Sequence, residues 1–491
     1  MSVQIPTQER QIPTQERTTA RAAVETGRRV ILLEFNELSP ALMDTFIAQG
    51  YLPHFKRLRE ICQVFTTDAE EVAPTLDPWI QWVTVHSGLS FDEHGIHHLG
   101  DGHKLQVKSL WDFVSDKGLP VWVCGSMNIK YDSPIRGAVV PDPWTTGVTP
   151  YPEEFAPYYA FVQHNVQEYT NEGLRMTAGD YLRFLSFMMR HGLSAHTVTS
   201  IVRQLATERM TGRGRWKRAA ILDKLQRDIF LHYLRKTRPA LATFFLNSTA
   251  HLQHVHWRNM DPEPFKVKPT DAEQAEYQHA VRFGYIEMDR ILADIVAAAP
   301  ADAVIVFATA LSQQPCLLYE DIGGKTFYRP RIGEKLLDFL GITECRAFEP
   351  VMSEQFHLRF DSASVAEDAA KRLGALRIDG KEVMTVELRD GNVFAGCTIF
   401  RTLDPGAVLK GGPNGTSIEF FRLFYQVENL KSGMHHPDGM MWIRVPGLAP
   451  RVYAEKVSLR DVAPTLLALL GIEKPSYMSG KPLLAMRRAA A

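Results

Sequence analysis

The sequence predicts an α/β fold in which a central, mostly parallel sheet carries helices on both of its faces. Short apolar runs without polar alternation, at residues 28–33, 242–246 and 303–307, are typical of strands that are buried on both sides. Amphipathic segments with helical periodicity separate the runs, which favours parallel strands joined by helices. Each run leads into polar, acidic or imidazole side chains, and ligands of open α/β sheets bind beyond the carboxyl ends of the strands.

Composition excludes several classes of function. The 55 Lys and Arg residues nearly balance 56 Asp and Glu, so the net charge of -1 creates no overall field that draws the chain to nucleic acid or to an anionic membrane. The chain has neither an apolar run long enough to span a bilayer nor the apolar segment of a secretory signal. Its five cysteines form no CxxC pair, which is typical of reduced thiols. We therefore expect a cytoplasmic protein with no nucleic-acid partner and no membrane span, and the sequence leaves its oligomeric state open.

The chain divides into a tail, a core and two insertions. Residues 1–27, which repeat the polar motif QIPTQER, predict a disordered tail. Residues 28–322 and 432–491 predict the α/β core, and together they are long enough to bury a large hydrophobic interior. A helical insertion is expected at about residues 150–238, and a small α+β insertion or cap at 323–431.

The first strand is expected to end near a group of acidic and amide side chains. Glu34 closes the apolar run, and Ser39 and Pro40 then open a helix as its N-cap and first-turn residues. Side chains of an extended segment alternate with a period of two, so Glu34 and Asn36 are expected on the same face. Glu37 lies just before the helix, where the macrodipole favours an acid.

Several elements follow this first helix. Asp77 directly precedes Pro78, an order that is typical of a helix N-cap but is also consistent with a catalytic carboxylate. Residues 109–113 predict a helix and 121–125 a strand. Within the small insertion, the pattern predicts a strand, a helix and two further strands, at residues 356–360, 364–373, 383–388 and 393–399.

The helical insertion has an apolar face and a basic cluster. The aromatic and Met-rich face of residues 180–189 predicts core packing. The basic cluster consists of Arg213, Arg215, Lys217 and Arg218. A solvated helix face is the ordinary interpretation of such a cluster, and contact with an anionic substrate is the alternative.

Three histidines lie within six positions after the apolar run 242–246: His251, His254 and His256. Any one of them can simply form hydrogen bonds in a loop. Three together beyond the end of a buried strand favour a binding or catalytic site.

The segment around these histidines resembles the metal-binding strand end of the type I phosphodiesterase/nucleotide pyrophosphatase branch of the alkaline phosphatase superfamily. The family pattern there is T-D-x-x-Q-H-x-x-W-R, and the matching residues are Thr249, Gln253, His254, Trp257 and Arg258. Ala250 stands at the position of the metal-binding Asp. Similar family motifs recur in order at 74–82, 94–96, 433–439 and 480–483. The resemblance implies an alkaline-phosphatase-like fold.

The resemblance also implies that most metal ligands have been replaced. Family members hold two zinc ions, and His254 and His435 match two ligands of one of them. Neutral residues occupy the other ligand positions: Asn36, Ala250 and Ala310 in place of aspartates, and Leu311 in place of a histidine. An amide oxygen is a poor zinc ligand, and alanine and leucine bind no metal. The resemblance therefore implies at most one divalent metal, zinc or manganese, held by His254 and His435, or none.

Further candidate residues are assigned from their positions in these motifs. The candidates for catalysis, or for completing the metal shell, are Asp77, Thr75, Glu34, Asn36 and His256. In the family the nucleophile is a Thr at a helix N-terminus; counting along the motif reaches Pro78 or Asp77, which leaves Thr75 as the nearby hydroxyl. The candidates for substrate binding are His251, Gln253 and His436.

Three functions are compatible with these residues. The first is a phosphodiesterase- or phosphatase-like hydrolase or transferase, with at most one metal, acting on a small phosphate-ester or nucleotide-linked substrate. The second is a metal-free transferase, acting on a nucleotide sugar or a similar molecule, in which imidazoles and carboxylates do acid–base or nucleophilic work. The third is a non-catalytic binding relative, a pseudoenzyme.

Overall fold

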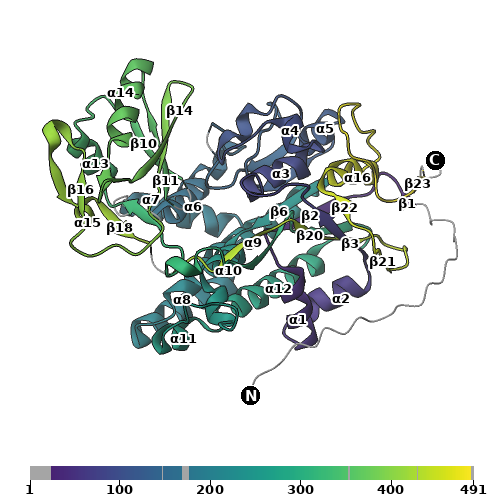
Figure 1. Ribbon diagram of the computed structural model, residues 1–491. Helices are drawn as coiled ribbons and strands as arrows, with labels where there is room; N and C mark the ends of the chain where they lie inside the picture. The colour runs from purple at the N-terminus through teal and green to yellow at the C-terminus, as the bar shows by residue number, and fades with distance from the viewer. Residues whose placement is uncertain (1–23, 146, 169–175, 352–353, 428–429, 488–491) are drawn as a thin grey trace.

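The computed structural model describes residues 24–145, 147–168, 176–351, 354–427 and 430–487. A large central sheet crosses it (Figure 1). In spatial order, its strands are β21 (Arg451–Val452), β3 (Gln63–Asp68), β20 (Asp438–Arg444), β7 (Val304–Ala308), β2 (Val30–Phe35), β6 (Leu241–Leu246), β4 (Val121–Cys124) and β5 (Gly137–Val140), and β22 (Val457–Ser458) also pairs with β3. The strands from β7 to β5 are parallel, whereas β20 runs antiparallel to β7 and β3. The predicted fold class is confirmed.

Strand β2 lies between β7 and β6, and all six of its residues are buried. Helices cover both of its faces, which explains why its sequence is apolar without alternation. Because β2, β6 and β7 are parallel, the segments that follow Phe35, Leu246 and Ala308 come out at the same edge of the sheet. This edge brings the candidate site residues of three distant segments together.

Helices lie on both sides of the sheet (Figure 1). Those on one side are α1 (Pro40–Ala48), α2 (Pro53–Glu60), α9 (Ala219–Thr237) and α12 (Ala280–Ala298). Those on the other side are α3 (Pro78–Ser87), α5 (Leu110–Asp116) and α16 (Val462–Leu469). Further helices and a small two-stranded pair belong to this part of the chain: α4 (Phe91–His94), α10 (Ser248–Met260), α11 (Asp271–Tyr277), β1 (Val24–Glu25) and β23 (Met486–Arg487). As predicted, Ser39 and Pro40 are the N-cap and first-turn residues of α1.

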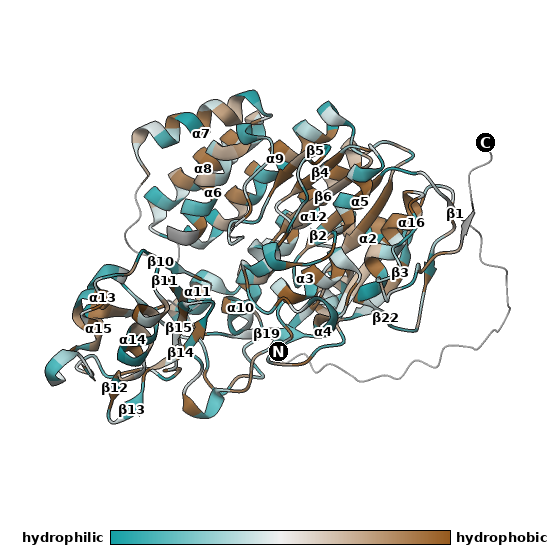
Figure 2. Cartoon of the chain, turned by 90° about the horizontal axis from the view of Figure 1, so that it is seen from above, coloured by the Kyte–Doolittle hydropathy of each residue, from teal (hydrophilic) through white to brown (hydrophobic). Residues whose placement is uncertain are grey.

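The segment before α9 is helical, as the sequence predicts. It contains α6 (Ala156–Glu168), α7 (Ala178–Arg190) and α8 (Ala195–Thr211) (Figure 2). Only one side of α7 packs into the core, through Phe184, Phe187 and Met188. Its other side exposes apolar side chains, so the expectation of core packing for residues 180–189 describes half of this helix. The residues that remain exposed are Leu182, Leu185 and Met189.

Residues 323–431 form small antiparallel sheets around a hydrophobic cluster of their own, at one end of the molecule (Figure 1). One sheet orders its strands as β10 (Ala347–Pro350), β11 (Gln355–Arg359), β15 (Asn392–Cys397) and β14 (Met384–Arg389). The other orders them as β13 (Lys381–Glu382), β12 (Arg377–Ile378), β16 (Val408–Lys410) and β17 (Ser417–Glu419). The remaining elements are α13 (Gly333–Leu340), α14 (Ala363–Gly374), α15 (Phe420–Leu423) and the pair β9 (Tyr328–Pro330) and β18 (Phe424–Gln426). The four elements predicted here correspond to β11, α14, β14 and β15.

Within the described ranges, no helix combines the length and the apolar character that crossing a bilayer requires. All five cysteines are free thiols.

Two histidines lie where the 323–431 segment contacts the core. The rings of His98 and His357 both pack against Phe394, at centroid distances of 5.7 and 4.9 Å. Lys104 and Asp390 add an ion pair of 2.9 Å at this contact. Burial, together with the Arg389 guanidinium, lowers the pKa of His98 to about 4. Burial, together with Arg359 and Arg389, lowers the pKa of His357 to about 4 as well.

We expect this contact to weaken in acid. The folded protein keeps His98 and His357 neutral down to about pH 4, whereas in the unfolded chain they take up protons below their ordinary pKa of 6.5. Stability from this source is therefore complete above pH 6.5 and is lost as the pH falls towards 4. The urea midpoint should fall less between pH 7 and pH 5 in a His98→Gln, His357→Gln variant than in the unmodified protein. Replacing the exposed His196 by Gln is the control, and an equal fall in all three proteins would refute the expectation.

Candidate metal centre

The centre is built around Glu37, directly beyond the end of β2. Its backbone is left-handed, with φ of 59°, a conformation that costs a non-glycine residue about 1–3 kcal/mol. Two hydrogen bonds stabilise this turn: the Glu37 N–H donates to the Thr309 carbonyl at 3.2 Å, and Gln253 Nε2 donates to the Glu37 carbonyl at 2.8 Å. The carboxylate is buried, and it accepts hydrogen bonds from Asn36 Nδ2 at 2.8 Å and from Gln313 Nε2 at 2.5 Å.

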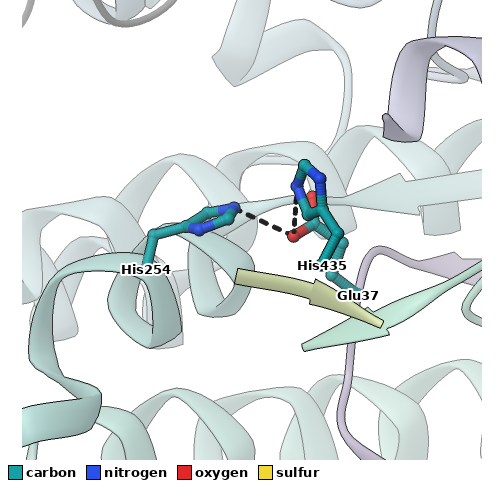
Figure 3. A group of neighbouring side chains, drawn as sticks. All are labelled: Glu37, His254 and His435. Carbon is teal, nitrogen blue, oxygen red and sulfur yellow. Dashed lines mark ion pairs between the residues drawn. The ribbon is translucent and has the colours of Figure 1, made fainter. Parts of the chain in front are cut away.

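The expectation that Glu37 serves as an acid at the helix N-terminus is wrong. Helix α1 begins only at Pro40, and the left-handed turn directs the Glu37 carboxylate towards two imidazoles instead (Figure 3). In the family pattern V-I-G-L-D-G-x-x-P, Pro40 aligns with the last residue and Glu37 with the second glycine. Glycine suits a left-handed turn, and this chain places a carboxylate there.

His254 lies on α10, the helix that follows β6 directly, so the histidines of this segment are helical rather than in a loop. Its Nε2 is 3.0 Å from Glu37 Oε2. Its Nδ1 is 3.0 Å from the Gly433 carbonyl oxygen, which can only accept a hydrogen bond, so Nδ1 carries the proton. The contact fixes the orientation of the ring and leaves Nε2 directed at the carboxylate.

His435 lies on β19 (Gly433–His436), which pairs antiparallel with β8 (Ser312–Pro315). Its Nε2 is 3.4 Å from Glu37 Oε2, and its Nδ1 is 3.2 Å from Asp77 Oδ1. The ring centroids of His254 and His435 are 5.1 Å apart (Figure 3). His435 therefore joins the carboxylates of Glu37 and Asp77.

Asp77 occupies the N-cap position of α3 in its backbone but does not cap the helix with its side chain. Its carboxylate contacts His435 instead of the N–H groups of the first helical turn. A carboxylate behind a histidine ring is the usual outer contact of a metal-binding histidine.

These contacts shift the pKa values of the three central groups. Burial lowers the pKa of His435, but Glu37 and Asp77 outweigh this effect and raise it to about 9. Burial raises the pKa of Glu37, yet His435 and His254 hold it well below its ordinary value. For His254, burial dominates and lowers the pKa, although Glu37 opposes the shift. A neutral His254 ring has one N–H, so it cannot donate to both the Gly433 carbonyl and the Glu37 carboxylate that face its two nitrogens.

A divalent cation fits this arrangement. Glu37, His254 and His435 form a cluster whose possible ligand atoms all lie within 4.8 Å of one another. Ligands about 2.0–2.1 Å from a tetrahedral zinc ion are about 3.3 Å apart. The measured separations of 3.0 and 3.4 Å are close to that value. Two histidines and a glutamate are also a known donor set for catalytic zinc.

Asn36 and Gln253 support the cluster. The Asn36 oxygen accepts a hydrogen bond from Trp82 Nε1 at 2.7 Å, and its amide group donates to Glu37 and to Asn247. The oxygen that would bind a metal is therefore already engaged. Gln253 accepts from the Tyr285 hydroxyl at 2.7 Å while it holds the backbone of Glu37.

Glu34 and Thr75 are directed elsewhere. The Glu34 carboxylate is fully buried and bonds to His86 Nε2 at 2.7 Å and to Ser126 Oγ at 2.5 Å. It does not join the metal cluster, because alternation along the strand turns it into this separate network. The Thr75 hydroxyl donates to Glu71 at 2.6 Å.

The remaining predicted histidines surround the cluster without joining it. His256 is buried and stacks on Tyr277, and burial lowers its pKa to about 3. His251 has its pKa lowered to about 4 by burial, with further contributions from His254 and Arg329. His436 accepts the Asp438 N–H at Nδ1, over 3.1 Å. Substrate-binding roles for His251, Gln253 and His436 stay predictions.

Apolar side chains fill the positions of the lost ligands. Ala250, Ala310 and Leu311 are all buried in the structure. Ala310 keeps a left-handed backbone with φ of 57°. These side chains carry no metal-binding atom, and the expectation of at most one metal stays a prediction.

Sequence reasoning missed Glu37 and Gln313 as members of the site. Glu37 carried a signal, because a charged residue stands where the family pattern has glycine. Gln313 carried none, since its approach to Glu37 depends on the pairing of β8 with β19.

Comparisons of the sequence with protein-family models and with curated proteins find no match. Among solved structures, phosphonoacetate hydrolase from Sinorhizobium meliloti is similar over 92% of this chain and 100% of its own, at 13% identity and a TM-score of 0.42. Alkaline phosphatase PafA is similar over 94% and 99%, at 12% identity and 0.45. Murine ectonucleotide pyrophosphatase/phosphodiesterase 5 is similar over 94% and 98%, at 9% identity and 0.40.

At these identities and TM-scores, the similarity concerns only the path of the backbone. It assigns no activity to this protein.

We expect the purified protein to bind one zinc or manganese ion per chain, as measured by mass spectrometry of the metal content. A His254→Ala, His435→Ala variant should lose the metal, and Glu37→Gln should weaken its binding. Asp77→Asn should lower the affinity about 10- to 100-fold, because it replaces the charged acceptor behind His435 with a neutral amide.

His436→Ala, next to His435 on β19, is the matched control and should retain the metal. Absence of metal after loading with zinc, manganese or iron, or full retention in the double variant, would rule out this centre.

Proposed function

We propose that the protein is a hydrolase or transferase with one divalent metal that acts on a small phosphate-ester or nucleotide-linked substrate. The observation that supports this most strongly is the convergence of Glu37, His254 and His435, with Asp77 and the Gly433 carbonyl behind the two rings. The resemblance of the surrounding motifs to phosphodiesterases gives the reaction class.

The charges around the centre favour an anionic substrate. The two carboxylates of Glu37 and Asp77 balance one divalent cation. Lys431 is close enough to lower the pKa of His254, and Arg329 that of His251. A phosphoryl group that approaches from this side therefore meets positive charge.

The centre is partly open to solvent. The side chains of His254, His435 and Asp77 are 25%, 16% and 26% exposed, whereas that of Glu37 is 3% exposed. A substrate can thus reach the imidazole side of the cluster while Glu37 stays shielded. Glu37, His254 and His435 would hold a zinc or manganese ion here, which would supply Lewis-acid polarisation of a phosphoryl oxygen.

Asp77 has two functions in this proposal. One carboxylate oxygen holds His435 in the orientation that directs Nε2 at the cluster. The exposed side of the carboxylate accepts a proton from the attacking group, a contribution that is typically about 10²–10⁴-fold in rate. The Thr75 hydroxyl donates a hydrogen bond to Glu71, so in this proposal it neither orients His435 nor accepts a proton.

The proposal predicts metal-dependent turnover of bis-p-nitrophenyl phosphate, p-nitrophenyl phosphate or a nucleotide sugar. Asp77→Asn should lower kcat about 10²–10⁴-fold. Thr75→Ala is the matched control, because it removes a hydroxyl two residues away that points at Glu71, and it should keep activity. Chelation should abolish turnover, and zinc or manganese should restore it.

The two other functions give different results in the same assay. Activity that survives chelation but is lost in Asp77→Asn or His254→Ala would instead support a metal-free transferase, with the Asp77–His435 pair as its acid–base group. Saturable binding without turnover of any substrate would support a non-catalytic relative.

A further inference from the structure

A small cavity lies at the edge of the sheet opposite to the metal centre. It has a volume of about 230 Å³. Its walls come from the residues that lead into β2, β6 and β7, together with the end of α9. Two backbone bonds join these entry segments: the Val30 N–H donates to the Ala240 carbonyl and the Val304 N–H to the Arg29 carbonyl, both at 2.8 Å.

Three arginines converge on this cavity: Arg29, Arg235 and Arg238. Among the described residues, none of the three guanidinium groups has an ion pair or a hydrogen bond with a protein side chain. Asp302 lies in the same turn as two of the lining residues, Pro300 and Ala303, and forms no ion pair with any of these arginines. Three arginines thus line one recess, and none of them has an ion pair within the described part of the chain.

The backbone of Arg238 is a second, independent observation. Arg238 is the C-cap of α9 and has a left-handed conformation, with φ of 45° and ψ of 57°. Glycine is the usual residue here because a side chain makes this conformation unfavourable. An arginine held in a strained conformation at the rim of a cationic cavity is a feature that function can explain.

Ordinary helix electrostatics explain only part of the cluster. Arg235 lies in the last turn of α9, where the macrodipole favours a cation. Arg29 precedes a strand and Arg238 is strained, so this explanation does not extend to them. Lys236, next to Arg235, places its ammonium over the Tyr233 ring at 5.1 Å. Unlike the three arginines, it has a partner in the protein.

We propose that this cavity binds a small phosphorylated molecule through Arg29, Arg235 and Arg238. Guanidinium groups bind phosphoryl oxygens through paired, charge-assisted hydrogen bonds, and three of them match a doubly charged group. The rest of the wall is apolar and accommodates a small organic part beside the phosphate; it includes Ile31, Leu234 and Ala298. A volume of about 230 Å³ limits the ligand to a molecule smaller than a dinucleotide.

This site is separate from the metal centre. Strand β2 runs from Arg29 at the cavity to Glu37 at the metal centre, and its six residues span about 20 Å. The inference does not depend on the proposed function, since it uses none of the metal ligands. It gives the chain a second place at which a phosphate compound is bound.

The test uses pyrophosphate and inorganic phosphate as probes, with the full chain carrying His254→Ala and His435→Ala so that anions at the metal centre do not contribute. We expect both probes to raise Tm at constant ionic strength, relative to sodium chloride. Adding Arg29→Gln, Arg235→Gln and Arg238→Gln should weaken binding at least about tenfold, because three charge-assisted contacts are lost. The control variant changes three exposed arginines of α8 and its end, Arg203, Arg209 and Arg213, to Gln, and it should keep the full response.

Arg238→Gly provides a second variant in case the triple variant does not fold. Glycine relieves the left-handed turn, so Tm without the probe should rise, while the increase caused by pyrophosphate should shrink. Three results would overturn the proposal. Neither probe raises the Tm of the starting protein; the increase in Tm is unchanged in the arginine variants; or the control variant loses as much of this increase as they do.

Discussion

One buried carboxylate shared by two imidazoles organises the candidate site. Glu37 Oε2 lies 3.0 Å from His254 and 3.4 Å from His435, and each ring is held from behind by an oxygen acceptor. This arrangement has more acceptors than protons, because neutral His254 cannot donate to both the Gly433 carbonyl and Glu37. A cation removes the imbalance. The surrounding amides of Asn36 and Gln313 hold the carboxylate in the only place where both rings reach it.

Asn36 and Glu37 belong to one hydrogen-bonded arrangement. The sequence resemblance implies that Asn36 stands at the position of a metal-binding aspartate, and Glu37, the next residue, supplies the carboxylate of the cluster. The Asn36 amide donates to Glu37, and its oxygen accepts from Trp82. Ala310 and Leu311, which the resemblance places at two further ligand positions, are buried apolar side chains.

Much of the fold could be predicted from the sequence, because strands buried on both faces leave an apolar signature. β2, β6 and β7 are examples, and the hairpin β14–β15 follows from alternation. Less of the candidate site could be predicted from the sequence. Alternation along β2 places Glu34 and Asn36 on one face, and both do contact α3, through His86 and Trp82. The cluster instead uses Glu37, whose left-handed turn beyond the strand no periodicity predicts. The partner of Asp77 and the position of Gln313 depend on how distant segments pair, which no local pattern contains.

The order of the ligands along the chain has a consequence for how the protein matures. Glu37 follows the second strand, His254 lies on α10, and His435 comes from β19, after the whole 323–431 segment. Contacts between such distant segments form late in folding, because the loops between them must close first. A chain emerging from the ribosome therefore cannot bring all three groups together until residue 435 has been synthesised. Binding of an ion by all three groups would then be coupled to near-completion of the polypeptide, and a product truncated before His435 would lack one of them.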